Sequence, residues 1–180
     1  MVVLRHALKR LTILAFIVLT VTASSPSSTT GTPPKSEVTE FPSVKEARGR
    51  ARLLHEAMHA TLQIVHHEYY REDEALKIPA ATMREVFREL ADRQKVELRW
   101  LAVNAQAMNV DHKPRDDFEK QAVAELASGK NEFERVDNGV YRLVGTITLT
   151  SDCLKCHVPN RTSNRERAAG LSISIPLQKP

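Results

Sequence analysis

The sequence predicts an α+β domain with an antiparallel sheet, and three observations lead to that class. A stretch with helical periodicity, residues 44–70, precedes shorter stretches in which apolar and polar residues alternate. Two of these stretches, 133–136 and 140–150, are joined through Asn138-Gly139, a pair that supplies the positive φ angles of a tight hairpin turn. The 180 residues contain no internal repeat, so a repetitive architecture is not expected.

The first predicted helix begins after Ser43, which can cap it, and Glu46 completes a capping box. Six apolar positions fall on one stripe at 100° per residue and should face the core: Ala51, Leu54, Met58, Leu62, Val65 and Tyr69. His55, His59 and His66 lie together along one edge of this stripe. Three imidazoles in that position suit the wall of a pocket, and the alternative for each is a hydrogen-bonded histidine without a metal.

A second helix is predicted over residues 80–95, because Ile78-Pro79 interrupts the chain before it. Its apolar face has the spacing i, i+3, i+4, i+7 and consists of Met83, Val86, Phe87 and Leu90. The remaining predicted elements are a strand over 96–100, a polar loop over 104–117, a helix from Asp116 or Asp117 to Ala127 that ends at Gly129, and a last strand over 169–176.

The first 23 residues have the pattern of a secretory signal peptide. Its parts are a basic segment with Arg5, Lys9 and Arg10, an apolar segment over 11–21, and a cleavage site at Val21-Thr22-Ala23. The apolar segment is shorter than the ~20 residues that a spanning helix needs, so we expect cleavage and no membrane span afterwards. Residues 24–42, rich in Ser, Thr and Pro, are expected to form a flexible linker, and residues 43–180 a single domain.

The formal net charge of +4 mostly reflects the signal peptide. Removal of its three basic residues leaves 23 Lys and Arg against 22 Asp and Glu. A nearly neutral mature chain does not indicate a nucleic-acid partner. About 157 residues remain after cleavage, which is enough for one domain with a substantial core.

The clearest chemical signal is Cys153-Leu154-Lys155-Cys156-His157, a C-x-x-C-H motif that is typical of covalent haem c attachment. The two thiols can form thioethers with the two vinyl groups of one porphyrin, and His157 would then bind the iron. Cys153 and Cys156 are the only two cysteines in the chain. Because haem c is attached outside the cytoplasm, the signal peptide agrees with this interpretation, and we expect one covalent haem c.

A redox-active dithiol and a structural zinc site are the alternatives for these cysteines. A redox-active pair is expected at the first turn of a helix, but residues 158–165 show no helical periodicity, so we expect the motif to lie in a loop between two strands. A structural zinc site would need a second pair of cysteines or histidines, and none follows. The motif therefore favours haem.

The segment His55-Glu56-Ala57-Met58-His59 also matches the H-E-x-x-H signature of zinc peptidases, in which two histidines bind the metal and the glutamate activates water. The extended signature fails, because Leu62 and Val65 stand where a glycine and a third histidine would be. A downstream acid remains an option as the third ligand. A zinc metallopeptidase that uses His55, Glu56 and His59 is thus the alternative function.

A haem iron bound by His157 has a second axial position, whose ligand sets the potential and decides whether gases can bind. His59, at the centre of the histidine row, is the first choice for that ligand. The alternatives are His55, His66, Met83 and Met108. Two imidazoles would give a lower potential than one imidazole and one thioether.

Three segments carry a family resemblance: a polar block with Asn109, Pro114 and Phe118-Glu119, the C-x-x-C-H motif, and the final strand 170–177. Together they resemble a family of exported bacterial haem c proteins with a PAS-like sensor fold. The block departs from the family pattern at His112, where a second asparagine is usual, and by one extra residue before Glu119. Some members are thought to place a cysteine opposite the proximal histidine, and this chain has no third cysteine.

The resemblance implies a five-stranded antiparallel PAS-like sheet that holds haem in a redox-sensing or gas-sensing module. Because no output domain follows in this sequence, we expect the chain to act through an unknown redox or signalling protein, or as a one-electron carrier. The expected location is the periplasm or another exported compartment, and a homodimer is compatible with the sequence. We do not expect enzymatic activity, because no acid–base pair can be placed near the haem.

Overall fold

A computed structural model describes residues 40–179 except 106, 108, 159, 161, 164 and 166. The predicted signal peptide, most of the predicted linker and Met108 lie outside the described residues. The helical elements are α1 (Val44–Tyr69), η1 (Glu72–Glu74), α2 (Pro79–Gln94), η2 (Val110–His112), α3 (Asp117–Ala127) and α4 (Ser151–His157). The strands are β1 (Glu97–Ala102), β2 (Glu132–Asp137), β3 (Val140–Leu149) and β4 (Arg167–Pro176).

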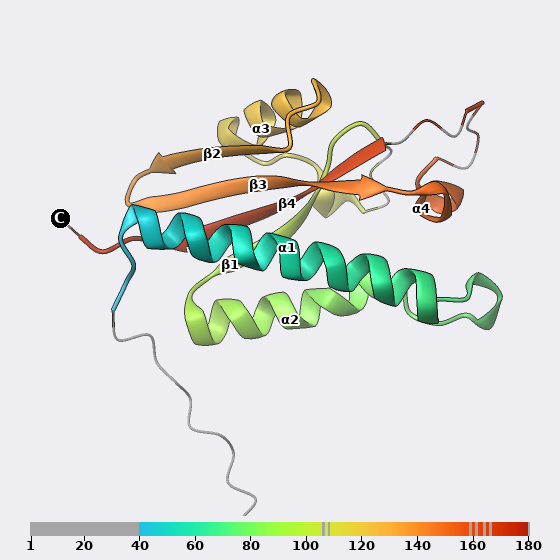
Figure 1. Cartoon of the computed structure of the whole chain (residues 1–180), viewed down its shortest axis with the longest axis horizontal. Helices are drawn as coiled ribbons and strands as arrows, with labels where there is room; N and C mark the ends of the chain where they lie inside the picture. Colours follow the sequence, from blue (N-terminus) through green and yellow to red (C-terminus); the bar gives the residue numbers. More distant parts are fainter. Residues whose placement is uncertain are drawn as a thin grey trace, which may run out of the picture. The chain divides into compact units, whose positions relative to one another are not determined.

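The strands form one antiparallel sheet in the order β1-β4-β3-β2 (Figure 1). The predicted hairpin between β2 and β3 is confirmed, with positive φ at both Asn138 and Gly139. The α+β class is also confirmed. The described residues contain a four-stranded sheet, however, where the family resemblance implied five strands. Among the described residues between β1 and α3, η2 is the one regular element.

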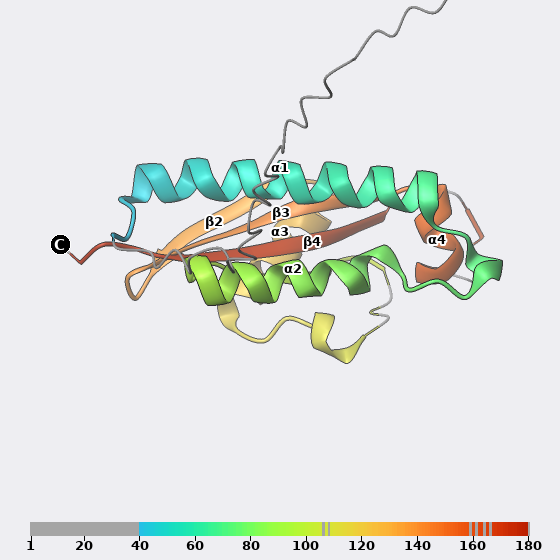
Figure 2. The ribbon, with the colours of Figure 1, turned by 90° about the horizontal axis from the view of Figure 1, so that it is seen from below.

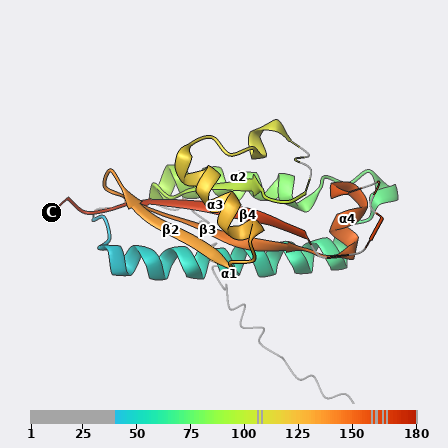
Figure 3. The same cartoon turned by 90° about the horizontal axis from the view of Figure 1, so that it is seen from above.

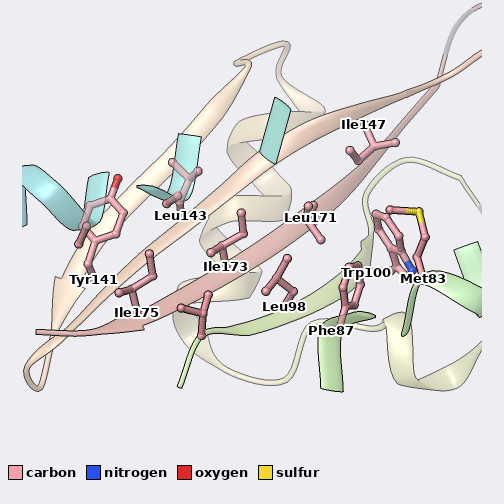
Figure 4. Close-up of a cluster of buried hydrophobic side chains, with 13 residues drawn as sticks. Met83, Phe87, Leu98, Trp100, Tyr141, Leu143, Ile147, Leu171, Ile173 and Ile175 are labelled. Carbon is pink, nitrogen blue, oxygen red and sulfur yellow. The ribbon is translucent and has the colours of Figure 1, made fainter. Parts of the chain in front are cut away.

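Helices cover both faces of the sheet (Figures 2 and 3). α1 packs on β3 and β4, α2 packs on β1, and α3 packs on the opposite face against β2. The larger core lies between the sheet and the first two helices, with Phe87, Trp100, Leu143 and Ile173 among its members (Figure 4). The smaller core lies under α3 around Phe118. β1 and β3 thus supply apolar side chains to both cores, because alternate residues of a strand point to opposite faces.

The long first helix has the capping box that the sequence predicted: the Ser43 hydroxyl accepts from the Glu46 N–H, and the Ser43 N–H donates to the Glu46 carboxylate at 2.9 Å. Ala51 is buried, and Leu54, Met58 and Leu62 pack against the core. The end of the predicted stripe is wrong, because Tyr69 is 71% exposed. The last turns of α1 border a cavity instead of the core.

The second helix is held to β1 by Trp100, whose indole Nε1 donates to the Ala80 carbonyl at 2.8 Å. Met83 and Phe87 are buried as predicted, but Val86 is 43% exposed and does not belong to the apolar face. Val86 therefore lies toward the outer side of α2. Among the described helices, none is both long and apolar enough to cross a bilayer.

Candidate functional site

The C-x-x-C-H motif forms the short helix α4 directly after β3, so the prediction that it lies in a loop is wrong. The Leu154 N–H donates to the Thr150 carbonyl at 3.0 Å, and the Leu154 side chain is buried. Helical spacing of i, i+3 and i+4 brings Cys153, Cys156 and His157 to one side of α4. Because the cysteines lie in a helix, the local structure of the motif does not exclude a redox-active dithiol. The residues around the motif are needed to distinguish that dithiol from a haem site.

These three side chains line a cavity of about 990 Å³. α4 lies at the end of the sheet where β3 stops, beside the C-terminal end of α1 (Figures 1 and 2). The other walls come from the last turns of α1, the start of α2, the end of β1 with the segment up to His112, and the ends of β3 and β4. Segments that are far apart in the sequence therefore enclose the motif.

The cavity walls combine apolar and charged side chains. The large apolar contributors are Leu62, Ile78, Trp100, Ile147 and Leu149. The charged contributors are Glu68, Arg71, Asp73, Arg84, Asp152 and Lys155. Both cysteines are free thiols, and the Cys153 Sγ lies 3.5 Å from the Thr150 hydroxyl. Such a cavity can hold a large, mostly apolar group, and its three basic side chains can pair with negative substituents of that group.

The histidines of the described residues divide into two groups. His66, His67, His112 and His157 line the cavity, whereas His55 and His59 do not. The predicted histidine row is therefore split by the structure. Of the two methionine alternatives, Met83 is buried in the larger core and is not part of the cavity wall.

His55 has a packing role. Its ring lies against Gly145 of β3, and its Nε2 lies 3.1 Å from the Thr146 carbonyl, to which it must donate. The neighbouring His59 ring is 5.7 Å away between centroids. Burial lowers the pKa of His59, and so does the nearby His55. His55 thus joins α1 to the sheet and does not line the cavity of the C-x-x-C-H motif.

Two cavity histidines have lowered pKa values. Burial lowers the pKa of His66, and Asp152 and Lys155 act on it in opposite directions. Burial also lowers the pKa of His112, and the positive charges of Arg84, Arg99 and His157 act in the same direction. Both imidazoles are therefore biased toward the neutral form, which is the form that binds metals.

The H-E-x-x-H segment does not assemble a metal site in the part of the chain that the structure describes. No group of three His, Cys, Asp or Glu side chains there is arranged to hold an ion. The His55 Nε2 donates its proton to the Thr146 carbonyl, and the Glu56 side chain is 77% exposed. Nothing in this geometry favours the peptidase alternative.

We compared the sequence and the fold with those of known proteins. The family profile described as Tll0287-like matches residues 42–172. This chain belongs to the Tll0287-like family. The crystal structure of the cyanobacterial haem protein Tll0287 is similar to it, with a TM-score of 0.57, 16% sequence identity, 75% of this chain covered and 98% of that chain covered. A comparison with curated proteins found no match.

The matched region of the Tll0287-like chain contains α1, the cavity walls and the C-x-x-C-H motif. Sequence reasoning missed His112 and the arginines Arg71 and Arg84 as cavity residues. His112 lies in the short turn η2, Arg71 lies in a loop, and Arg84 occupies an exposed position of α2. At none of these positions does sequence periodicity indicate the direction of the side chain. The only sequence signal at His112 is its departure from the family pattern.

Proposed function

We propose that this Tll0287-like chain is an exported monohaem c protein that works in redox or gas sensing or in one-electron transfer, and that it is not an enzyme. The observation that carries the proposal is the placement of Cys153, Cys156 and His157 on one side of α4, where all three line the same cavity. The similar cyanobacterial structure is that of a haem protein, which supports the same assignment.

The residues present fit a covalent haem. Cys153 and Cys156 would form the two thioethers, and His157 would bind the iron. The apolar walls would cover the porphyrin, and Arg71 and Arg84 would be available to pair with its carboxylates. When bound, haem supplies one-electron chemistry, and the protein tunes its potential through ligation, burial and hydrogen bonds.

The cellular setting follows from the amino terminus. A signal peptide over residues 1–23 would deliver the chain to the periplasm, where haem c is attached. A redox or signalling protein would then be its partner. An exported location is compatible with electron transfer or sensing outside the cytoplasm.

Expression of the full chain in a host that makes cytochromes c tests the proposal. We expect the mature protein to gain the mass of one haem and to give a pyridine haemochrome typical of two thioethers. Cys153→Ala and Cys156→Ala should each give the spectrum of a single thioether, and the double variant should lose the covalent haem. These changes are expected because each substitution removes one thioether bond to the haem.

Fluorescence provides an independent readout, because Trp100 is the only tryptophan and lines the cavity. Haem in that cavity would quench its emission by energy transfer, and the double cysteine variant would emit strongly. A mature wild-type protein without added porphyrin mass, or with unquenched Trp100 emission, would contradict the proposal. Zinc without a Soret band would instead support the peptidase alternative.

A further inference from the structure

His112 lines the cavity from η2, a different element from the helix α4 that carries His157. It ends the short η2 turn, which packs against β1, and it lines the cavity together with His157. The two imidazoles therefore border the same space. They belong to segments about 45 residues apart in the chain, and the cavity wall includes both.

The turn that carries His112 is fixed by backbone and side-chain hydrogen bonds. The Asn109 side chain accepts from the Asp111 N–H at 2.9 Å, and the Asn109 carbonyl accepts from the His112 N–H at 3.0 Å. One nitrogen of the Arg99 guanidinium donates to the carbonyls of Asp111 and Lys113, the residues on either side of His112. The turn is thereby attached to β1.

Arg99 is itself held by a buried carboxylate. Its Nη1 donates to the Glu119 Oε2 at 2.5 Å, and that oxygen also accepts from the Arg115 N–H at 2.8 Å. Glu119 is only 2% exposed. A guanidinium fork between a buried carboxylate and two carbonyls restricts the turn strongly, because each of these bonds is charge-assisted. Such support is what orients a metal-binding imidazole.

The other histidines are less suited to face His157. The His66 ring packs on Tyr70, with 5.0 Å between centroids, and its charged neighbours are Asp152 and Lys155. The His67 side chain is 74% exposed, and its Nδ1 lies 3.8 Å from Asp152. His66 and His67 therefore lie beside the helix bearing His157 and also line a groove next to its first turn.

We propose that His112 is the second axial ligand of the haem iron, and that Arg99 and Glu119 are positioning residues for it. This inference rests on the proposed function, because it needs haem attached through Cys153 and Cys156. It replaces His59, which does not line the cavity, as the first choice for that ligand. Two imidazole ligands predict a low-spin iron with a low reduction potential.

Spectroscopy of the haem-loaded full chain tests the ligand. We expect the wild type to be low-spin and His112→Ala to be high-spin with the same amount of covalent haem. Added imidazole should restore the low-spin spectrum. His66→Ala is the matched control, because it removes another half-buried cavity histidine, and it should remain low-spin.

A second variant, His112→Met, keeps the test informative if His112→Ala does not fold. His112→Met should stay low-spin, gain the far-red band of methionine coordination, and show a higher reduction potential than the wild type. A high-spin wild type, or a low-spin His112→Ala beside a high-spin His66→Ala, would overturn the inference and leave the haem proposal intact. Absence of porphyrin mass on the wild type would overturn both.

The positioning role has its own readout. Arg99→Lys keeps the charge but loses the planar fork, so part of the population should become high-spin while haem content is unchanged. Arg93→Lys, which alters an exposed pair with Glu89, is the control and should keep the wild-type spectrum. A fully low-spin Arg99→Lys would show that Arg99 does not position His112.

Discussion

At the scale of single residues, the contact between His55 and Gly145 explains why α1 can approach the sheet closely. A Cβ built on Gly145 would lie 2.3 Å from the His55 Cδ2. The absence of a side chain at this position lets the imidazole reach the Thr146 carbonyl. A histidine that looked like a metal ligand in the sequence thus fastens a helix to a strand.

Gly145→Ala should therefore lower the free energy of unfolding by roughly 1–3 kcal/mol, because an overpacked core forces neighbouring groups to move. Urea denaturation followed by circular dichroism would measure the change. Gly49→Ala is the matched control, because a Cβ on Gly49 meets nothing within 4 Å. It should stabilise α1 by about 0.5–1 kcal/mol through helix propensity.

A double-mutant cycle separates the proposed clash from other effects. Combining Gly145→Ala with His55→Ala should cost less than the sum of the two single changes, since the second substitution removes the group that clashes. Strict additivity would show that the ring of His55 is not what excludes the methyl group.

At the scale of secondary-structure elements, a cluster of charged side chains joins α1 to the edge strand β2. The Arg48 Nη2 lies 2.7 Å from the Glu134 Oε1, and the Tyr141 hydroxyl donates to Glu134 at 2.5 Å. The hydrogen bond from Arg48 lowers the pKa of Glu134 below its ordinary 4.5, although burial opposes this effect. The cluster should therefore be weakened by acid.

The sign of that dependence follows from linkage. Because the folded state lowers the pKa of Glu134, its contribution to stability is complete above about pH 4.5 and is lost as the pH falls through the folded value. Glu134→Gln should reduce the fall in stability between neutral and acidic pH. Chemical denaturation at several pH values would measure it.

Glu89→Gln provides the control for this experiment, because Glu89 belongs to an exposed pair with Arg93 within α2. Exposed pairs of this kind contribute little to stability. If both variants follow the wild-type pH curve, Glu134 does not couple protonation to folding.

At the scale of the whole domain, the cavity lies where several elements end and is not within the continuous core. α4, the end of β1 and the segment before η2 reach it from different directions, whereas the sheet centre is filled by the two cores. A group bound there would contact all of these segments at once. Its attachment should stabilise the cavity walls more than the strands.

Hydrogen exchange measured by mass spectrometry tests this expectation. Compared with the variant lacking Cys153 and Cys156, the haem-loaded protein should show slower exchange in peptides covering 103–113 and 151–158. Peptides from the centres of β3 and β4 should change little, because their protection comes from the sheet. Equal slowing everywhere would indicate global stabilisation, and no slowing would place the haem elsewhere.

Local sequence signals predicted the elements of this domain well. The Ser43 capping box, the Asn138-Gly139 turn and the alternation in β3 act over a few residues, so they can be recognised without the tertiary structure. The C-x-x-C-H motif likewise predicts its chemistry from spacing alone. Predictions were poorer for Tyr69 and Val86, whose burial depends on where a helix meets the sheet.

The sequence by itself determined the α+β class, the order of most elements and the thiol and imidazole groups of the C-x-x-C-H motif. Only the tertiary structure decided that the motif is helical, that His55 packs on Gly145, and that His112 shares a cavity with His157. The physical reason is range: hydrogen-bonded turns and helical periodicity act between near neighbours in the chain. The walls of a cavity depend on how distant segments pack, which local periodicity does not record.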